Sequence, residues 1–278
     1  MTARRLTVLV LALAGSAGAP AGATAAERGR VHAGTTSADD PIVLVRSGRE
    51  VTRLAMQISA RCAGGSDRVA LLIDAPTGIA VRRTGRFAAE ERLDAPLASG
   101  RVARGTLTVN GRVRGRRVEG TVRYRAKLLD AAGATADRCR QRFTFKARSG
   151  RGTAYGGSSS QRAPVTLGVR GRTVADGATL RLRRTVRRFG IGWRASWSDG
   201  GTVQIGERLR VGVRVRNGRF AAAWTEERGR DTVAYSLEGT LRGGRATGTF
   251  RARVTRAGAS GSQRTADTGA ITFTARSR

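Results

Sequence analysis

Apolar and polar residues alternate at every second position through much of this chain. In the segment 118–128, apolar residues or Gly stand at the even positions, and Glu, Thr, Arg or Lys stand at the odd ones. The segments 211–215 and 248–254 show the same alternation. A period of two residues is typical of antiparallel strands with one face on a core and the other in water. Beyond the first residues, no apolar stripe of helical period predicts a major helix.

These patterns predict an all-β fold. Each half of the chain contains roughly eight strand candidates separated by Gly, Asn and Ser turns. Asn217-Gly218 follows the alternating segment 211–215 and is a favoured two-residue hairpin turn. This number of short antiparallel strands fits a sandwich or an up-and-down barrel. Consecutive hairpins favour a meander, and we therefore expect a barrel-like or strongly curved architecture.

The two halves of the chain are related to each other. HAGTTSADDPIVL at 32–44 corresponds to YGGSSSQRAPVTL at 155–167, and GRFAA occurs at both 85–89 and 218–222. Near the end of each half, FTFKARS at 143–149 corresponds to ITFTARS at 271–277. Because the matches keep their order, we interpret them as a duplication. The sequence predicts a signal peptide at 1–25, a first β-domain at 26–149, a linker at 150–154 and a second β-domain at 155–278.

The first residues resemble a secretory signal. Arg4 and Arg5 precede an apolar run, Leu6 to Ala14, and small residues follow it. The run is shorter than the ~20 residues that span a bilayer, so we favour a cleaved signal over a membrane anchor. We expect cleavage after Ala25, with Ala26 as the alternative, and secretion to the cell envelope or the extracellular space.

Both cysteines, Cys62 and Cys139, fall in the first unit. An exported protein meets an oxidising compartment, and two cysteines allow one intrachain pairing. In the alignment of the two units, a position near Ser198 corresponds to Cys62 and one near Asp267 corresponds to Cys139. The second unit therefore lacks both cysteines. Both cysteines are present in the first unit and both are missing from the second, which favours a disulfide. Two buried free thiols are the alternative.

Most catalytic chemistries lack the residues they need. The chain has a single histidine, His32, which aligns with Tyr155 and is interpreted as a packing or surface ring. No multi-histidine metal shell, phosphate loop or dinucleotide fingerprint is present in the sequence, and we predict no cofactor and no catalytic residue. Three acidic pairs, Asp39-Asp40, Glu90-Glu91 and Glu226-Glu227, could serve glycoside hydrolysis, but we interpret them as solvated acids at strand ends or turns.

The chain carries a net charge of +32, and all but two of its basic residues are arginine. Guanidinium groups suit phosphate, sulfate and carboxylate ligands. Acidic envelope polymers or other extracellular polyanions are therefore candidate partners, while GC-rich coding bias is an alternative source of the arginines. The candidate anion-contacting positions lie on outward faces of predicted strands: Arg123, Arg125, Arg214, Arg216, Arg251 and Arg253.

All three tryptophans, Trp193, Trp197 and Trp224, lie in the second unit. Exposed rings would suit sugar recognition, but Trp193 and Trp197 share the apolar side of their predicted strand, which favours core packing. The sequence as a whole predicts a secreted, non-catalytic binding or structural module. The alternative is a secreted carbohydrate-active enzyme or carbohydrate-binding protein.

Overall fold

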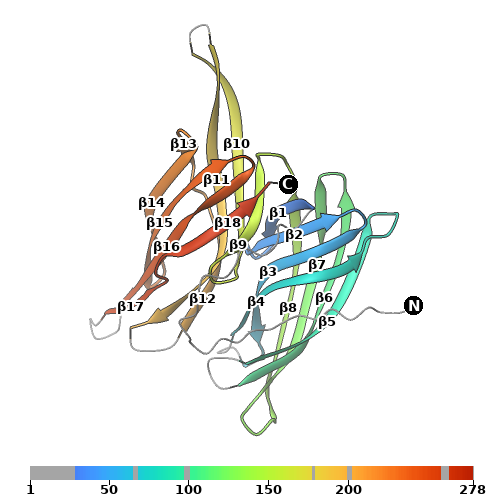
Figure 1. Ribbon diagram of the computed structural model, residues 1–278. Coiled ribbons are helices and arrows are strands. Elements are labelled where there is room, and N and C mark those ends of the chain that lie inside the picture. The colour runs from blue at the N-terminus through green and yellow to red at the C-terminus, as the bar shows by residue number, and fades with distance from the viewer. Residues whose placement is uncertain are drawn as a thin grey trace.

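The computed structural model describes residues 29–64, 68–96, 101–176, 179–198, 202–257 and 263–277. Within these ranges the chain forms strands and turns and contains no helix, which confirms the all-β expectation (Figure 1). The predicted signal peptide, 1–25, lies outside the described residues.

Two sheets follow each other along the chain, and we call them the first and second domains. The first comprises β1 (Arg30–Thr36), β2 (Pro41–Ser47), β3 (Glu50–Cys62), β4 (Arg68–Ala80), β5 (Arg86–Pro96), β6 (Val102–Arg114), β7 (Arg117–Leu129) and β8 (Thr135–Arg148). The second comprises β9 (Ala154–Ser159), β10 (Pro164–Asp176), β11 (Thr179–Trp197), β12 (Thr202–Leu209), β13 (Val213–Val215), β14 (Arg219–Arg228), β15 (Asp231–Arg242), β16 (Arg245–Ala257), β17 (Gln263–Asp267) and β18 (Ile271–Arg276).

Both domains are antiparallel meanders with the same strand order. The first runs β4-β3-β2-β1-β8-β7-β6-β5, so β1 pairs with β8 and the other neighbours are consecutive in sequence. The second runs β12-β11-β10-β9-β18-β16-β15-β14. Its two additional strands are β13, which pairs with β11, and β17, which precedes β18 and pairs with both β11 and β16. The expectation of two tandem related β-domains is therefore confirmed.

Alternation along the strands separates core from surface. In β7 the even-numbered apolar residues are buried and the odd-numbered arginines are exposed. The predicted turn at Asn217-Gly218 is also present, since both residues have positive φ angles, 49° and 76°, and join the bridged pair Arg216 and Arg219. This backbone is the one that two-residue hairpins prefer.

A short hairpin separates two long strands in each domain. β1 and β2 are seven residues each, and beyond the turn that joins them β3 pairs directly with β8, at Arg61↔Arg140 and Cys62↔Cys139. In the second domain, β11 and β17 meet in the same way beyond the β9–β10 turn. The two turns also match locally, because Asp39 and Arg162 both have positive φ angles, 62° and 57°.

The domains pack through the outward faces of their first hairpins. Five consecutive residues of β2, 41–45, are buried, because the strand is covered on both faces. Val31, Val43 and Val45 form a buried cluster outside the first domain's core. A Cβ at Gly156 of β9 would lie 2.7 Å from Val31 and 2.8 Å from Val43, so glycine permits the close approach.

Candidate functional site

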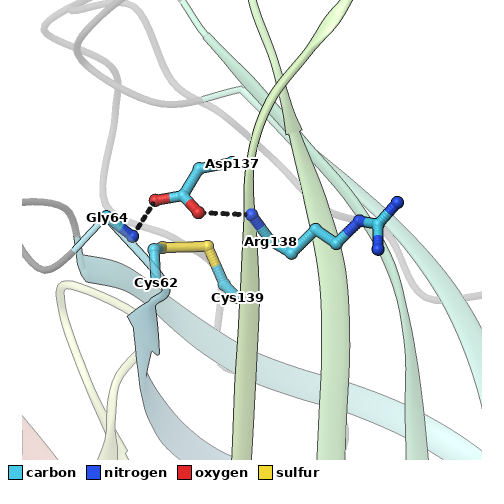
Figure 2. The surroundings of a disulfide bond; sticks show 5 residues. All are labelled: Cys62, Gly64, Asp137, Arg138 and Cys139. Atoms are coloured by element: carbon cyan, nitrogen blue, oxygen red, sulfur yellow. Dashed lines mark hydrogen bonds between the residues drawn. A yellow bond between two sulfur atoms is a disulfide. The ribbon is translucent and has the colours of Figure 1, made fainter.

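Cys62 and Cys139 form the predicted disulfide. They are registered partners on β3 and β8, with Cα atoms 3.9 Å apart, and they are 6% and 2% exposed. Asp137 lies beside the bridge and accepts hydrogen bonds from the backbone N–H of Arg138, at 2.6 Å, and of Gly64, at 3.0 Å (Figure 2). These two donors lower the pKa of Asp137. The bridge thus fixes the place where β3 and β8 converge.

The second domain fills the same place with a stack of side chains. Trp197 and Ala266 are registered partners on β11 and β17, as the two cysteines are on β3 and β8. The sequence alignment, which pointed to Ser198 and Asp267, was therefore displaced by one residue at each position. The guanidinium groups of Arg256 and Arg264 lie 5.0 Å and 5.1 Å from the Trp197 ring centroid, which makes cation–π contacts.

The six arginines predicted to contact anions lie in three separate places. Arg123 and Arg125 are exposed on β7, and Arg251 and Arg253 are exposed at the equivalent positions of β16. Arg214 and Arg216 are exposed on β13 and at the hairpin that follows it. β13 pairs with β11, whereas β16 is flanked by β15, β17 and β18. The structure therefore does not gather the six into one surface.

A denser basic surface lies on β7 and β8. We define the β7–β8 basic face as six exposed residues: Arg123, Arg125, Lys127, Arg138, Arg140 and Arg142. The strand register places them opposite one another, in the pairs Arg123↔Arg142, Arg125↔Arg140 and Lys127↔Arg138. Directly opposed residues have Cβ atoms about 5 Å apart, and like charges in such pairs destabilise a sheet. None of the six forms an ion pair with any residue in the described ranges.

The matching surface of the second domain is compensated in part by one acid. Arg251 binds Asp267 through two hydrogen bonds, of 3.0 and 2.7 Å, and Arg253 lies 3.5 Å from the same carboxylate. Arg253 is the registered partner of Asp267, just as Arg125 is the registered partner of Arg140. At this position the first domain has arginine and the second has aspartate. The neighbouring pair Lys127↔Arg138 corresponds to a pair of threonines in the second domain, so that domain's face carries fewer opposed cations.

The titration of the second domain's acids agrees with this pairing. The hydrogen bonds from Arg251 are the main cause that lowers the pKa of Asp267. On β15, the hydrogen bonds from Arg256, at 2.6 and 2.8 Å, lower the pKa of Asp231. Both of these acids are thus already occupied by arginine.

Sequence reasoning missed the β8 half of the basic face. Arg138, Arg140 and Arg142 alternate with Cys139, Gln141 and Phe143, a pattern that marks outward positions of a strand. This alternation could have identified the three arginines as exposed. Their pairing with β7, however, depends on a strand register that the alternation does not give.

His32, the single histidine, is a core residue. It is 0% exposed and lies opposite Leu44, as Tyr155 lies opposite Leu167 in the second domain. Neither ring nitrogen has a hydrogen-bond partner. Burial, reinforced by the positive charges of Arg46 and Arg30, lowers the pKa of His32 to about 4. The ring is therefore neutral at physiological pH and has no orienting partner in the described residues.

The acidic pairs differ in part from the sequence interpretation. Glu90 and Glu91 lie within β5, opposite Thr108 and Leu107, and not at a strand end or turn. Asp40 is 5% exposed and so is not a solvated loop acid. Burial is the main cause that raises the pKa of Asp40 to about 7, and Asp39 adds to the effect.

Near the end of β14, Glu226 is occupied by neighbouring side chains. It accepts hydrogen bonds from the Trp224 indole, at 3.3 Å, and from Arg228, at 2.6 Å. Trp224 also stacks on Tyr235, with ring centroids 5.1 Å apart. Trp193 is 0% exposed, as expected of a core ring. Trp197 and Trp224 are half-buried against other side chains, and so neither forms a bare aromatic platform.

Comparison with known proteins adds little to this picture. Neither a family model nor a curated protein matches the chain. One solved structure, described as a "putative outer membrane protein" from Bacteroides fragilis NCTC 9343, is 12% identical and covers 90% of this chain and 96% of its own, with a TM-score of 0.22. A TM-score this low does not establish a common fold, and the likeness carries nothing about location or activity.

The described ranges contain neither a membrane-spanning helix nor a cluster of potential metal ligands. No helix there is long and apolar enough to cross a membrane. The same ranges contain no group of three or more His, Cys, Asp or Glu residues that could hold a metal ion.

Proposed function

We propose that this protein is an exported, non-catalytic binding module whose β7–β8 basic face binds a linear polyanion outside the cell. The observation that carries the proposal is the contrast between Arg140 and Asp267. The two residues occupy equivalent positions, yet only the second domain supplies an acid to its arginines. Arginines scattered by coding bias alone would not be expected to remain opposed and uncompensated on one face.

The geometry of the face suits a chain with repeated acidic groups. Alternate residues of a strand are about 6.6 Å apart, and neighbouring strands are about 4.8 Å apart. The three opposed pairs therefore form two parallel rows of cations over three successive outward positions of the ladder. Guanidinium groups present planar donors that match phosphate, sulfate or carboxylate oxygens. An anionic chain lying across the face would relieve the repulsion within each pair.

The partner class follows from the predicted export. Acidic envelope polymers and other extracellular polyanions are the ligands with repeated charge that such a protein would meet. The face offers arginine side chains and no enclosed aromatic site, so we expect charge and spacing, and not sugar identity, to govern binding.

The test uses the mature protein and heparin as a model polyanion. Arg140→Asp introduces at this position the aspartate that the second domain has there. Arg170→Asp on β10 is the matched control, because Arg170 is exposed and lies opposite Thr185. This substitution changes the net charge by the same amount as Arg140→Asp. We expect Arg140→Asp to weaken heparin binding at least tenfold, and Arg170→Asp to change it less than twofold. Neutral dextran should not bind.

Salt dependence separates a selected face from bulk charge. The proposal is supported if heparin binding persists well above physiological salt. Arg140→Asp should also reduce the dependence of heparin affinity on salt concentration, and Arg170→Asp should not. Equal losses in both variants, or binding abolished by a modest rise in salt, would overturn it and leave only the effect of net charge.

A further inference from the structure

A pocket lined by three arginines lies at the junction of the two domains. Its volume is about 330 Å³, and its charged lining consists of Arg30, Arg116 and Arg151. Ser149, Ser277 and two glycines complete the lining. Arg30 begins β1, Arg116 lies in the β6–β7 turn, and Arg151 lies in the segment that connects the domains. In Figure 1 the C-terminal end of the chain lies beside β1, at the same junction.

The two serines are equivalent residues of the two domains. Ser149 follows β8 and Ser277 follows β18, at matching positions of the repeat. The backbone N–H of Ser149 donates to the carbonyl of Arg116, at 2.8 Å, and that of Ser277 donates to the carbonyl of Gly244, at 3.0 Å. The pocket therefore forms where equivalent ends of the two domains meet, and neither domain contains all of its lining.

The hairpin contacts explain why these ends converge. β1 contacts β9 and β2 contacts β10, while β1 also contacts β10 and β2 contacts β9. Each element thus touches its own counterpart, as in an isologous dimer interface. An approximate two-fold arrangement brings matching positions together near its axis. The equivalence is incomplete, because Gly244 stands where the first domain has Arg116.

The lining is positively charged and lacks an acid. None of the three arginines forms an ion pair in the part of the chain that the structure describes. The Ser149 side chain is 9% exposed and has no hydrogen-bond partner there, so its hydroxyl can donate into the pocket. The Ser277 hydroxyl donates to the Gly244 carbonyl, at 3.2 Å. The three arginines are exposed residues, and guanidinium and hydroxyl donors around one pocket are complementary to an oxyanion of more than one negative charge.

We infer that this pocket binds a small phosphate-bearing anion at the junction of the two domains. Its volume is at the lower end of the range for small-molecule sites, which is about 300 to 1,000 Å³, and admits one sugar-sized group with its phosphate. The inference does not depend on the proposed polyanion function. Arg117, next to the pocket residue Arg116, and Arg123, in the β7–β8 basic face, are six residues apart on one strand, roughly 20 Å.

The experiment is calorimetric titration of the mature, full-length protein with three probes: inorganic phosphate, glucose 6-phosphate and glucose. We expect one saturable site for the phosphate-bearing probes and none for glucose. Tighter binding of glucose 6-phosphate would assign a phosphorylated small molecule, whereas equal or tighter binding of inorganic phosphate would assign the free anion. Either result supports a phosphate site.

Variants locate the site. Arg116→Gln and Arg151→Gln should each lower the affinity at least tenfold, and Ser149→Ala should lower it severalfold. Arg117→Gln is the matched control, because Arg117 is the next residue in sequence, its substitution removes the same charge, and it does not line the pocket. Arg140→Asp, which tests the basic face, should leave phosphate binding unchanged. Circular dichroism and the melting temperature verify that each variant is folded.

Three outcomes would overturn the inference. The first is the absence of saturable phosphate binding to the wild-type protein. The second is equal affinity of wild type, Arg116→Gln and Arg151→Gln. The third is an equal loss in Arg117→Gln and Arg116→Gln, which would assign the binding to general charge. Loss of phosphate binding with intact heparin binding, or the reverse, would distinguish this site from the β7–β8 basic face.

Discussion

Cys62 and Cys139 are bridged where β3 and β8 pair directly with each other. The β1–β2 hairpin separates these strands elsewhere, and so the bridge closes the fork at the end of that hairpin. In the second domain the same fork is closed by Trp197, whose ring contacts two guanidinium groups. One fold thus uses a covalent bond in one copy and packing in the other.

Removing the disulfide should destabilise the first domain selectively. The bridge joins residues separated by 77 positions, so the double variant Cys62→Ala/Cys139→Ala should lose about 4 kcal/mol in the chain-entropy description. Urea unfolding checks this, because all three tryptophans are in the second domain. Circular dichroism should show an early transition while tryptophan fluorescence keeps its wild-type midpoint. A fluorescence midpoint that shifts by the same amount would contradict selective destabilisation.

The second domain should accept the disulfide of the first. Trp197 and Ala266 are registered partners at the position of Cys62 and Cys139. We expect the variant Trp197→Cys/Ala266→Cys to form a second bridge on oxidation, because the strands converge there in the same way. Thiol titration of the denatured, unreduced protein should then find no reactive thiol. Two reactive thiols would show that the forks of the two domains differ in geometry.

Charge reversal on the basic face should stabilise the fold. Arg142 lies directly opposite Arg123, and Arg142→Glu replaces a repulsive cross-strand pair with an attractive one. We expect a gain of roughly 0.5 kcal/mol in the free energy of unfolding at low salt, since opposed charges on a sheet contribute about 0.2–1 kcal/mol. The gain should shrink in high salt, where exposed charges are screened. Urea titrations at two salt concentrations measure it, and a destabilised variant would contradict the pairing.

Two buried groups in the first domain should give stability opposite dependences on pH. Because folding lowers the pKa of His32 to about 4, its contribution is fully present above pH 6.5 and is lost as the pH falls toward 4. Because folding raises the pKa of Asp40 to about 7, its contribution is fully present below pH 3.8 and is lost as the pH rises toward 7. The two slopes oppose each other over nearly the same range.

Substitutions taken from the second domain separate these slopes. Asp40→Ala copies Ala163 and should raise stability at pH 7.5 by up to about 4 kcal/mol, because one unit of pKa shift is about 1.4 kcal/mol. In this variant the free energy of unfolding should also rise as the pH rises from 4 to 6.5, because only the pH dependence of His32 remains. His32→Tyr copies Tyr155 and should leave stability falling over that range. Urea unfolding at pH 4.5, 6 and 7.5 measures both, and unchanged slopes would contradict the burial of these groups.

The sequence predicted the architecture because its signals are local. Alternation along β7 and β16 marks a buried and a solvent face, and Asn217-Gly218 adopts the backbone that its residue types favour. The repeat predicted two related domains, and the cysteine count predicted the bridge. The candidate site was only half found, since Arg123 and Arg125 were identified while Arg138, Arg140 and Arg142 on β8 were not. Strand pairing depends on residues that are far apart in the sequence. It therefore cannot be predicted from the pattern of one segment.

The sequence by itself determined that this protein is built from two tandem antiparallel β-domains with arginine on the outward positions. This was possible because the two-residue period of a strand can be recognised in consecutive residues. The tertiary structure decided which arginines face each other and which meet an acid, since strand register brings Arg140 to Arg125 and Asp267 to Arg253. It also decided that equivalent ends of the domains converge on a pocket between Arg116 and Arg151. Strand pairing and domain docking depend on contacts between segments that are distant in the sequence. The charges on those segments therefore interact only after the chain has folded.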